Sequence, residues 1–243
     1  MIFNVLTLFP NTLNCFIQES IVRRAVERGI VQIHIHNIRD FSSDRHKSVD
    51  DYPFGGGHGM LMSPDPLFRA IESIQERGRV ICLSPMGTLL HQKRVRALAG
   101  ESSVTLICGH YEGIDQRVIE HLVDEEISIG DYILTCGEVA AAILIDTVTR
   151  ELEGTMGNTE SKLEESFDST GLLEYEQYTR PAELRGYSVP EVLLSGNHEE
   201  IKRWRMKRRI INTLERRPDL FDPSSLSDEY KKILYEALEE IEQ

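Results

Sequence analysis

Short apolar runs alternate with segments of helical periodicity in the N-terminal part of the chain. The apolar runs predict β-strands, which we expect at residues 3–8, 31–36, 80–83, 104–108 and 125–128. Helical spacing of apolar residues is found between these runs, at residues 17–28, 66–74, 92–98 and 115–121. Such an alternation of strand and helix is typical of an α/β domain with a largely parallel sheet.

A longer helix is expected from residue 138 to about residue 151, and the pattern changes after it. Gly137 stands just before this helix, and the alanines at 140–142 give it high intrinsic propensity. Residues 153–170 lack a hydrophobic period, so we expect an exposed linker there. The sequence therefore predicts a domain of residues 1–152, this linker, and a smaller domain of residues 171–243.

The smaller domain is predicted to be mostly helical. Asn197 followed by Glu200 resembles a capping box, which starts a helix. One face of that helix is apolar and leaves the basic residues largely for solvent or a partner; it carries Ile201, Trp204, Ile211 and Leu214. The last helix, from residue 228 to about residue 240, is amphipathic and acidic.

Charge is distributed unevenly along the chain. The formal net charge of −13 argues against a nucleic-acid binder when the chain is taken as a whole. The segment from Lys202 to Arg217 nevertheless holds eight Lys or Arg residues and one acidic residue, Glu215. This density, with Trp204 interleaved, favours contact with RNA or phosphate. The candidate RNA-binding residues are Lys202, Arg203, Arg205, Lys207, Arg208 and Arg209.

The four cysteines show no Cys-x-x-Cys spacing, which fits reduced thiols better than a disulfide framework. No stretch reaches the ~18 apolar residues that are needed to span a bilayer. The apolar N-terminus has no preceding basic run, as a secretion signal would have. Together these features predict a soluble cytoplasmic protein.

A glycine-rich cluster, residues 55–59, follows a run of charged residues at 44–51. Four glycines among five residues allow positive φ angles and close approach of the backbone to a ligand. The spacing matches neither a dinucleotide-binding fingerprint nor a phosphate-binding loop, because no Lys-Ser or Lys-Thr pair follows it. A flexible surface loop explains the glycines equally well.

Three further loops follow predicted strands, and each contains glycine: residues 83–87, 108–115 and 128–138. In open α/β sheets, ligands bind beyond the carboxyl ends of the strands. An ordinary turn is the simpler explanation of any one loop. The three together favour a pocket for a nucleotide-like ligand, with backbone donors, an apolar slot and a few carboxylates.

Six strings of the sequence, taken in order, resemble one family. They are Asp-Arg-His-(x)3-Asp-Asp from residue 44, Gly-Gly-Gly-x-Gly-Met-Leu-Met from 55, Leu-Ser-Pro-x-Gly from 83, Cys-Gly-His-Tyr-Glu-Gly-Ile-Asp-x-Arg from 108, Ser-Ile-Gly-Asp-Tyr-Ile-Leu from 128, and Tyr-Thr-Arg-Pro from 178. The sequence is similar to the TrmD family of bacterial tRNA (guanine-N1)-methyltransferases over about residues 1–220. Residues 193–198 and the pair Trp204-Arg205 extend the match into the C-terminal region.

The resemblance implies a SPOUT-type fold with a deep trefoil knot, which the periodicity alone does not indicate. It further implies an obligate homodimer with active sites at the subunit interface, and S-adenosylmethionine held bent by the knot loops. Family members also depend on Mg²⁺ for methyl transfer. The positions that match the family's cofactor pocket are Leu83, Ser84, Pro85, Gly109, Tyr111, Glu112, Gly113, Ile129, Gly130, Tyr132, Leu134, Gly137 and Ala140.

The implied reaction is methylation of guanine N1 at tRNA position 37, next to the anticodon. Guanine N1 carries a proton at neutral pH, so a general base must remove it as the methyl group arrives. The family uses an Asp in an Asp-Ser-Phe string, and Glu165 takes that position here. Negative charge then spreads onto the guanine O6, and Arg150 matches the arginine that stabilises it. From spacing alone, a solvated linker explains Arg150 and the nearby carboxylates more simply.

Three positions depart from the family pattern. Glu165 is one methylene longer than Asp, and Asp168 is a nearby alternative base. Cys136 replaces the first glycine of the family's Gly-Gly-Glu, and it is strained if that backbone needs a positive φ. His58 stands where a small residue or Pro is usual.

Two other classes of function compete with the methyltransferase. One is a non-catalytic RNA-binding protein of the same fold, which only the altered base position supports. The other is a phosphate- or nucleotide-processing enzyme built on residues 55–59, which predicts a lysine among those glycines, and there is none.

Overall fold

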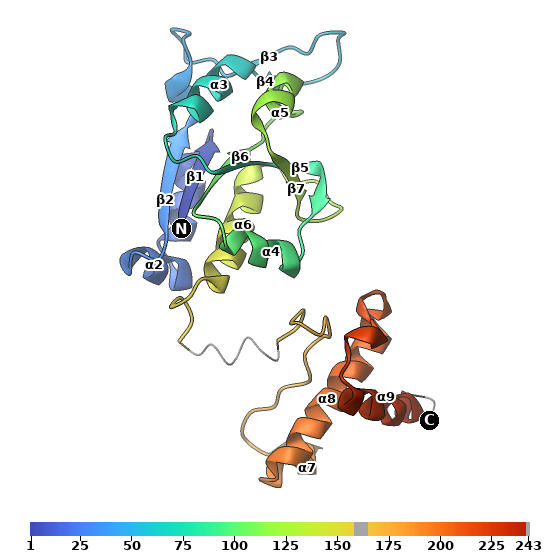
Figure 1. Cartoon of the computed structure of the whole chain (residues 1–243). Coiled ribbons are helices and arrows are strands. Elements are labelled where there is room, and N and C mark those ends of the chain that lie inside the picture. Colours follow the sequence, from blue (N-terminus) through green and yellow to red (C-terminus); the bar gives the residue numbers. More distant parts are fainter. Residues whose placement is uncertain (158–164, 242–243) are drawn as a thin grey trace. The chain divides into compact units, whose positions relative to one another are not determined.

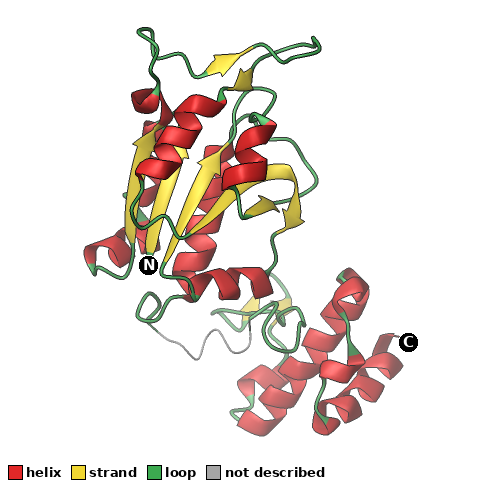
Figure 2. Ribbon diagram, turned by 45° about the horizontal axis from the view of Figure 1, so that its top comes forward, coloured by secondary structure: helices red, strands yellow, loops and turns green. Residues whose placement is uncertain are grey.

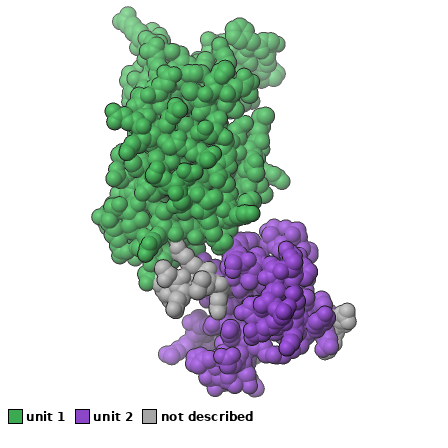
Figure 3. Space-filling model, in the orientation of Figure 1, with its two compact units in different colours: residues 1–157 green, residues 158–243 purple. Residues whose placement is uncertain are grey.

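The structure is a computed structural model that describes residues 1–157 and 165–241. The chain divides into two compact units, residues 1–157 and residues 158–243 (Figure 3). The first unit contains a β-sheet with helices on both faces, and the second is mostly helical (Figure 1). The boundary between the units lies within the predicted linker.

A parallel sheet of order β2-β1-β6-β5-β7 forms the centre of the first unit (Figure 2). Its strands are β1 (Ile2–Thr7), β2 (Gln32–Asn37), β5 (Arg79–Leu89), β6 (Ser103–Cys108) and β7 (Glu125–Ser128). Every neighbouring pair is parallel, so the carboxyl ends of the strands meet at one edge. All five predicted strands and the predicted α/β class are confirmed.

Two layers of helices cover the sheet because side chains alternate between its faces along each strand. Phe3 and Val5 of β1 face a core shared with α1 (Pro10–Ile17), α2 (Ser20–Glu27), α4 (Gln92–Ala99) and α6 (Gly137–Glu151). Leu6 faces a second core shared with η1 (Ile38–Phe41), α3 (Pro64–Ser73) and α5 (Gln116–Leu122). The sheet is therefore buried on both faces, as expected for parallel strands.

Two local predictions in this unit were wrong. The helix expected over residues 17–28 is α2, which begins only at Ser20, and the separate helix α1 that precedes it was not predicted. The strand expected to end at residue 83 continues through Leu89 as β5, and its register against β7 shifts between Leu83 and Thr88. Extended backbone therefore carries part of the loop that the sequence placed after this strand.

Two short hairpins lie outside the main sheet. Strands β3 (Asp50–Asp51) and β4 (Leu61–Met62) pair antiparallel and flank the glycine-rich cluster. In the second unit, β8 (Glu183–Leu184) pairs with β9 (Tyr187–Ser188).

The second unit is built around α8 (His198–Arg216) and α9 (Asp228–Ile241), preceded by the single turn α7 (Glu191–Leu194). Short 3-10 turns, η3 (Pro218–Leu220) and η4 (Pro223–Ser225), connect the two long helices. The predicted cap of α8 is confirmed, since the Asn197 side chain accepts a hydrogen bond from the Glu200 N–H. A separate apolar core joins the two helices and includes Met206, Ile210, Ile233 and Ala237.

The predicted linker, residues 153–170, is not one exposed segment. Residues 158–164 lie outside the described part of the chain, and residues 165–170 pack within the second unit. Asp168 is buried there against α8. Among the described residues, no helix is long and apolar enough to cross a membrane.

Candidate functional site

A cavity of about 600 Å³ opens at the carboxyl ends of β6 and β7 and beside residues 82–86 of β5, where the register of that strand shifts. The three loops predicted from the sequence line it, namely those that follow Leu83, Cys108 and Ser128. They meet because β5 lies between β6 and β7 in the sheet and all three strands point the same way. The volume falls within the range of small-molecule sites, roughly 300–1,000 Å³.

All thirteen residues that match the family's cofactor pocket lie in the wall of this one cavity. The structure thus brings together residues that are spread over a stretch of 58 residues, from residue 83 to residue 140. Their role in binding stays a prediction. Other lining residues, including Met86, Ile114 and Ile133, belong to the three predicted loops, whereas Leu61, Gln116 and Glu126 were not singled out as site residues from the sequence.

Close backbone approach shapes the cavity at Gly137, the first residue of α6. A Cβ atom at Gly137 would lie 2.6 Å from the backbone N of Gly109, so only glycine fits without displacing the β6 loop. The Gly137 N–H also donates to the Gly109 carbonyl at 3.0 Å. The start of α6 is therefore fixed to the end of β6 by main-chain contacts.

The expected strain at Cys136 is absent. Its φ of −160° and ψ of 151° are extended backbone, which any residue adopts. Cys136 lines the cavity, so its side chain is exposed to a bound ligand.

Two other thiols lie in or beneath the cavity wall. Burial raises the pKa of the Cys82 thiol to about 12, and burial likewise raises the pKa of Cys108 well above its usual value. Both therefore stay protonated at neutral pH, and neither is a thiolate nucleophile.

A buried network supports the β6 loop from below the cavity. The Glu138 carboxylate is fully buried, and both of its oxygens lie 2.8 Å from His110 Nε2. Thr7 donates a second hydrogen bond to this carboxylate, and Phe9 packs against the His110 ring. His110 and Glu138 lie in two of the predicted loops but were not selected as site residues. The sequence feature that could have identified Glu138 is its place in the first turn of a helix, where a carboxylate also complements the helix dipole.

Arg150 lies far from this cavity in its own chain. It is in the last turn of α6, whereas Gly137 and Ala140 line the cavity from the first turn. At 1.5 Å per residue, thirteen residues of helix place the Cα of Arg150 about 20 Å from that of Gly137. The structure therefore does not bring Arg150 to the cavity of the same chain.

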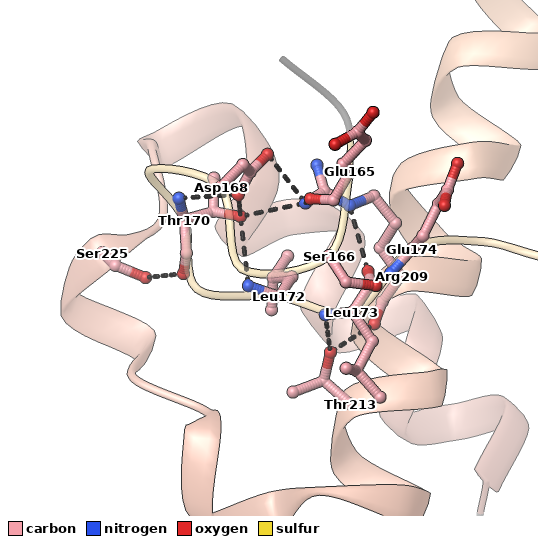
Figure 4. Close-up of polar contacts among 10 residues, drawn as sticks. All are labelled: Glu165, Ser166, Asp168, Thr170, Leu172, Leu173, Glu174, Arg209, Thr213 and Ser225. Carbon is pink, nitrogen blue, oxygen red and sulfur yellow. Dashed lines mark hydrogen bonds and ion pairs between the residues drawn. The ribbon is translucent and has the colours of Figure 1, made fainter. Parts of the chain in front are cut away.

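Glu165 and Asp168, the two candidate bases, belong to the second unit and differ in their surroundings. The Asp168 side chain is 5% exposed and forms an ion pair with Arg209 at 2.8 Å. The Glu165 side chain points away from that ion pair, while its backbone carbonyl faces Arg209 (Figure 4). Asp168 is thus buried inside the unit, whereas Glu165 is half-buried and its carboxylate points away from the ion pair.

The six candidate RNA-binding residues all lie on α8, but acidic groups of the same unit contact most of them. Arg203 pairs with Glu236 and Lys207 with Glu240, both on α9. Arg208 pairs with Glu176, and hydrogen bonds from Arg208 lower the pKa of that carboxyl. Lys202 and Arg203 are exposed, and Arg205 stacks over the Tyr175 ring at 4.7 Å.

Arg209 differs from the other five, and the prediction that it contacts RNA does not fit the structure. Its side chain is 4% exposed because it points into the second unit toward Asp168. A phosphate cannot reach a guanidinium that is buried in this way.

The glycine-rich cluster has the backbone that its sequence predicts. Gly55, Gly56, Gly57 and Gly59 all have positive φ. A Cβ at Gly59 would collide with the Glu112 side chain, so this segment approaches the β6 loop closely. The cluster itself does not line the cavity, although Leu61 just after it does.

No group of three or more His, Cys, Asp or Glu side chains within the described residues is arranged to hold a metal ion. The carboxylates in the cavity wall are Glu112 and Glu126. Mg²⁺ prefers an octahedral set of oxygen ligands, and these residues do not supply one by themselves. The described residues therefore give no support for a Mg²⁺ site.

Comparison with known proteins agrees with this geometry. The sequence model of tRNA (guanine-1)-methyltransferase TrmD matches residues 1–223. Proteins named tRNA (guanine-N(1)-)-methyltransferase are similar over nearly their whole length. The one from Caldanaerobacter subterraneus subsp. tengcongensis is 54% identical, covering 97% of this chain and 98% of that protein. Those from Brevibacillus brevis (99% of both chains) and Dehalococcoides mccartyi (99% and 98%) are 50% and 49% identical. The chain belongs to the TrmD family of tRNA (guanine-1)-methyltransferases.

Proposed function

We propose that this chain transfers a methyl group from S-adenosylmethionine to N1 of the guanosine at position 37 of tRNA. One observation carries the proposal within the chain: three loops from separate strands converge on a cavity lined by all thirteen positions of the family's cofactor pocket. The names of the relatives add the tRNA and the guanine N1.

The cavity fits the methyl donor by size and chemistry. Its wall combines apolar side chains such as Leu83 and Ile129 with backbone groups of glycines and the carboxylate of Glu112. S-adenosylmethionine supplies an electrophilic methyl group on its sulfonium. The chain's contribution is placement, because the loops fix the orientation of the donor before the guanine arrives.

Glu165 is proposed as the general base that accepts the N1 proton of guanine. Two observations support Glu165 over Asp168. Both Asp168 oxygens already accept hydrogen bonds inside the second unit, whereas the Glu165 carboxylate points away from that cluster (Figure 4). Arg150 is proposed to stabilise the negative charge that develops on the guanine O6.

The active site is proposed to form between two copies of the chain. Within one chain, the Cα of Arg150 is about 15 Å along α6 from that of Ala140, the nearest lining residue of α6, which is too far for Arg150 to act on a base held in the cavity. A second copy would bring its own Arg150 to this cavity. Exposed apolar side chains at the cavity rim support the dimer, with Met86 86% and Ile133 81% exposed.

The exposed part of the basic face of α8 is proposed to contact tRNA phosphates. Lys202 and Arg203 are the most accessible of its candidates, and Arg205, Lys207 and Arg208 are half-buried beside them. Because Arg209 is buried, it is excluded from this surface.

The remaining expectations come from the family. We propose the SPOUT-type knot, which is supported by the return of the chain at Gly137 to the end of β6. The reaction is assigned to the cytoplasm, where tRNA is modified. Dependence on Mg²⁺ stays a prediction, and no step proposed here passes through the metal.

The proposal is tested with purified protein, labelled S-adenosylmethionine and two tRNA transcripts that differ only at position 37. Methylation is expected on the transcript with guanosine and not on the transcript with adenosine. Glu165→Gln is expected to slow single-turnover transfer about 10²- to 10⁴-fold, the usual contribution of a general base. The matched control, Glu191→Gln, removes an exposed carboxylate at the start of α7 and should keep the full rate.

Two results would refute parts of the proposal. Failure to retain S-adenosylmethionine in calorimetry, in the dimer as well, would remove the donor from the cavity. A Glu165→Gln variant that transfers at the full rate would remove Glu165 as the base, and the methyltransferase activity would then stand without that assignment.

A further inference from the structure

Arg209 makes an unusual set of contacts for a residue on a basic helix face. Its guanidinium donates hydrogen bonds to Asp168 Oδ2 at 2.8 Å and to the Leu173 carbonyl at 3.1 Å. It also donates to Thr170 Oγ1 at 3.3 Å and to the Glu165 carbonyl at 3.5 Å (Figure 4). All four acceptors belong to residues 165–174, which we call the base segment. One side chain of α8 thus contacts the base segment near both of its ends.

Asp168 completes this arrangement from the other side. Its Oδ1 accepts hydrogen bonds from the Thr170 N–H at 2.8 Å and from Thr170 Oγ1 at 2.5 Å, while Oδ2 faces Arg209. A buried carboxylate is tolerated only when it is paired and hydrogen-bonded, and Asp168 meets both conditions. Its role is therefore to hold the turn.

Other side chains of α8 fix the far end of the base segment. Thr213 Oγ1 accepts from the Leu173 N–H at 2.9 Å, and Asn212 donates to the Glu174 carbonyl at 3.0 Å. Within the segment, Ser166 Oγ accepts from the Glu174 N–H at 2.9 Å. The backbone from Glu165 to Glu174 is therefore held against one helix, α8.

We infer that Arg209 is a positioning residue for methyl transfer: paired with Asp168, it fixes the base segment so that Glu165 presents its carboxylate to the guanine. This inference rests on the proposed role of Glu165. Misplacement of a catalytic group by about 1 Å can cost about 100-fold in rate. Glutamate has one more rotatable bond than aspartate, so its carboxylate is less precisely placed by its own side chain. A fixed backbone at Glu165 is therefore more important. Arg209 acts through Glu165 and touches neither RNA nor the methyl donor.

The test uses full-length Arg209→Lys and Asp168→Asn, with Arg217→Lys as the matched control. Lysine keeps the charge but cannot donate to Asp168 and Leu173 together as the arginine fork does. Arg217 also pairs with an aspartate, but at an exposed position after α8. We expect single-turnover rates at saturating tRNA to fall about tenfold in each test variant and to stay unchanged in the control. Affinity for S-adenosylmethionine should stay within about twofold of wild type.

A double-mutant cycle separates positioning from loss of folding. If Arg209 acts through Glu165, adding Arg209→Lys to Glu165→Gln should slow the reaction less than about twofold further. General destabilisation would slow both backgrounds equally. Folding is checked by the thermal unfolding of each variant, and Arg209→Lys is preferred to Arg209→Leu because it retains a cation opposite Asp168.

Two outcomes would overturn the inference. One is an unchanged single-turnover rate in Arg209→Lys and Asp168→Asn. The other is weaker tRNA binding in Arg209→Leu, with the slope of log affinity against log salt reduced by about one, which marks a phosphate contact. A fully active Glu165→Gln would instead refute the proposed base, so the two failures give different results.

Discussion

The donor cavity in the first unit and the base segment in the second are stabilised by different kinds of contact. The cavity depends on backbone proximity, since Gly137 and Gly109 touch through main-chain atoms and no side chain fits between them. The base segment depends on side chains of a single helix, chiefly Arg209 and Thr213. We therefore expect the cavity to be disrupted by substitutions that enlarge a residue, such as glycine to alanine. We expect the base segment to be disrupted by substitutions that remove a hydrogen-bonding side chain.

The difference corresponds to different tasks. If the cavity holds the methyl donor as proposed, it needs walls that are already in place, and main-chain contacts between a strand end and a helix start provide them. A base must be accurately placed on a turn that carries no regular backbone ladder, so it takes its position from the neighbouring helix. Three predictions test this contrast, in order of decreasing effect.

The largest effect is expected from Arg209→Leu on the stability of the second unit. Loss of the guanidinium leaves the Asp168 carboxylate buried without its partner, which typically costs about 3–5 kcal/mol. Arg217→Leu removes an exposed pair and should cost less than about 1 kcal/mol. Chemical unfolding, monitored by hydrogen exchange of residues 165–241, measures the free energy of unfolding of each variant. Equal losses in the two variants would contradict the structural role of Arg209.

An intermediate effect is expected from Gly137→Ala at the donor cavity. The added Cβ would meet the Gly109 backbone, and overpacking of this kind costs about 1–3 kcal/mol. If that strain falls on the bound state, affinity for S-adenosylmethionine drops by about 10- to 100-fold. Gly157→Ala is the control, because no atom of the described residues lies within 4 Å of its added Cβ. Equal calorimetric affinities for S-adenosylmethionine in the two variants would show that the close contact between Gly137 and the Gly109 backbone does not affect donor binding.

The smallest effect concerns the acid dependence of the second unit through Glu176. Hydrogen bonds from Arg208 lower the pKa of Glu176 below its ordinary value of 4.5 in the folded chain. The unfolded state therefore binds the proton more readily, and the stabilisation is complete above pH 4.5 and lost as pH falls through the folded pKa. Glu176→Gln should lower the unfolding temperature at pH 7 by a few degrees at most. The difference in unfolding temperature between wild type and Glu176→Gln should become smaller below pH 4.5. A difference that grows in acid would contradict the lowered pKa of Glu176.

The sequence predicted the first unit well because apolar runs report strands that are buried on both faces. It also predicted that three loops meet, since their places at strand ends and the order of a parallel sheet are linked. Helix α1 and the extension of β5 to Leu89 were missed. Both depend on pairing and packing that no local pattern records.

Charges were predicted less well than apolar positions. Arg209 and Lys202 look alike in the sequence, yet one is buried and the other exposed. What distinguishes them is contact with Asp168 and the rest of the base segment. That segment lies more than 30 residues before Arg209 in the chain, so no local pattern reveals the contact. The distance from Arg150 to the cavity had a simpler cause, because the length of the predicted helix already implied it.

The acidic last helix has a consequence for discrimination among polyanions. Glu236 and Glu240 of α9 act as internal counterions to Arg203, Lys207 and Arg208. If α8 contacts tRNA as proposed, an incoming phosphate has to displace a tethered carboxylate before it reaches these cations, so each contact adds less affinity. Short or disordered nucleic acids are therefore poor competitors, and a rigid partner that offers several phosphates at matching positions is favoured.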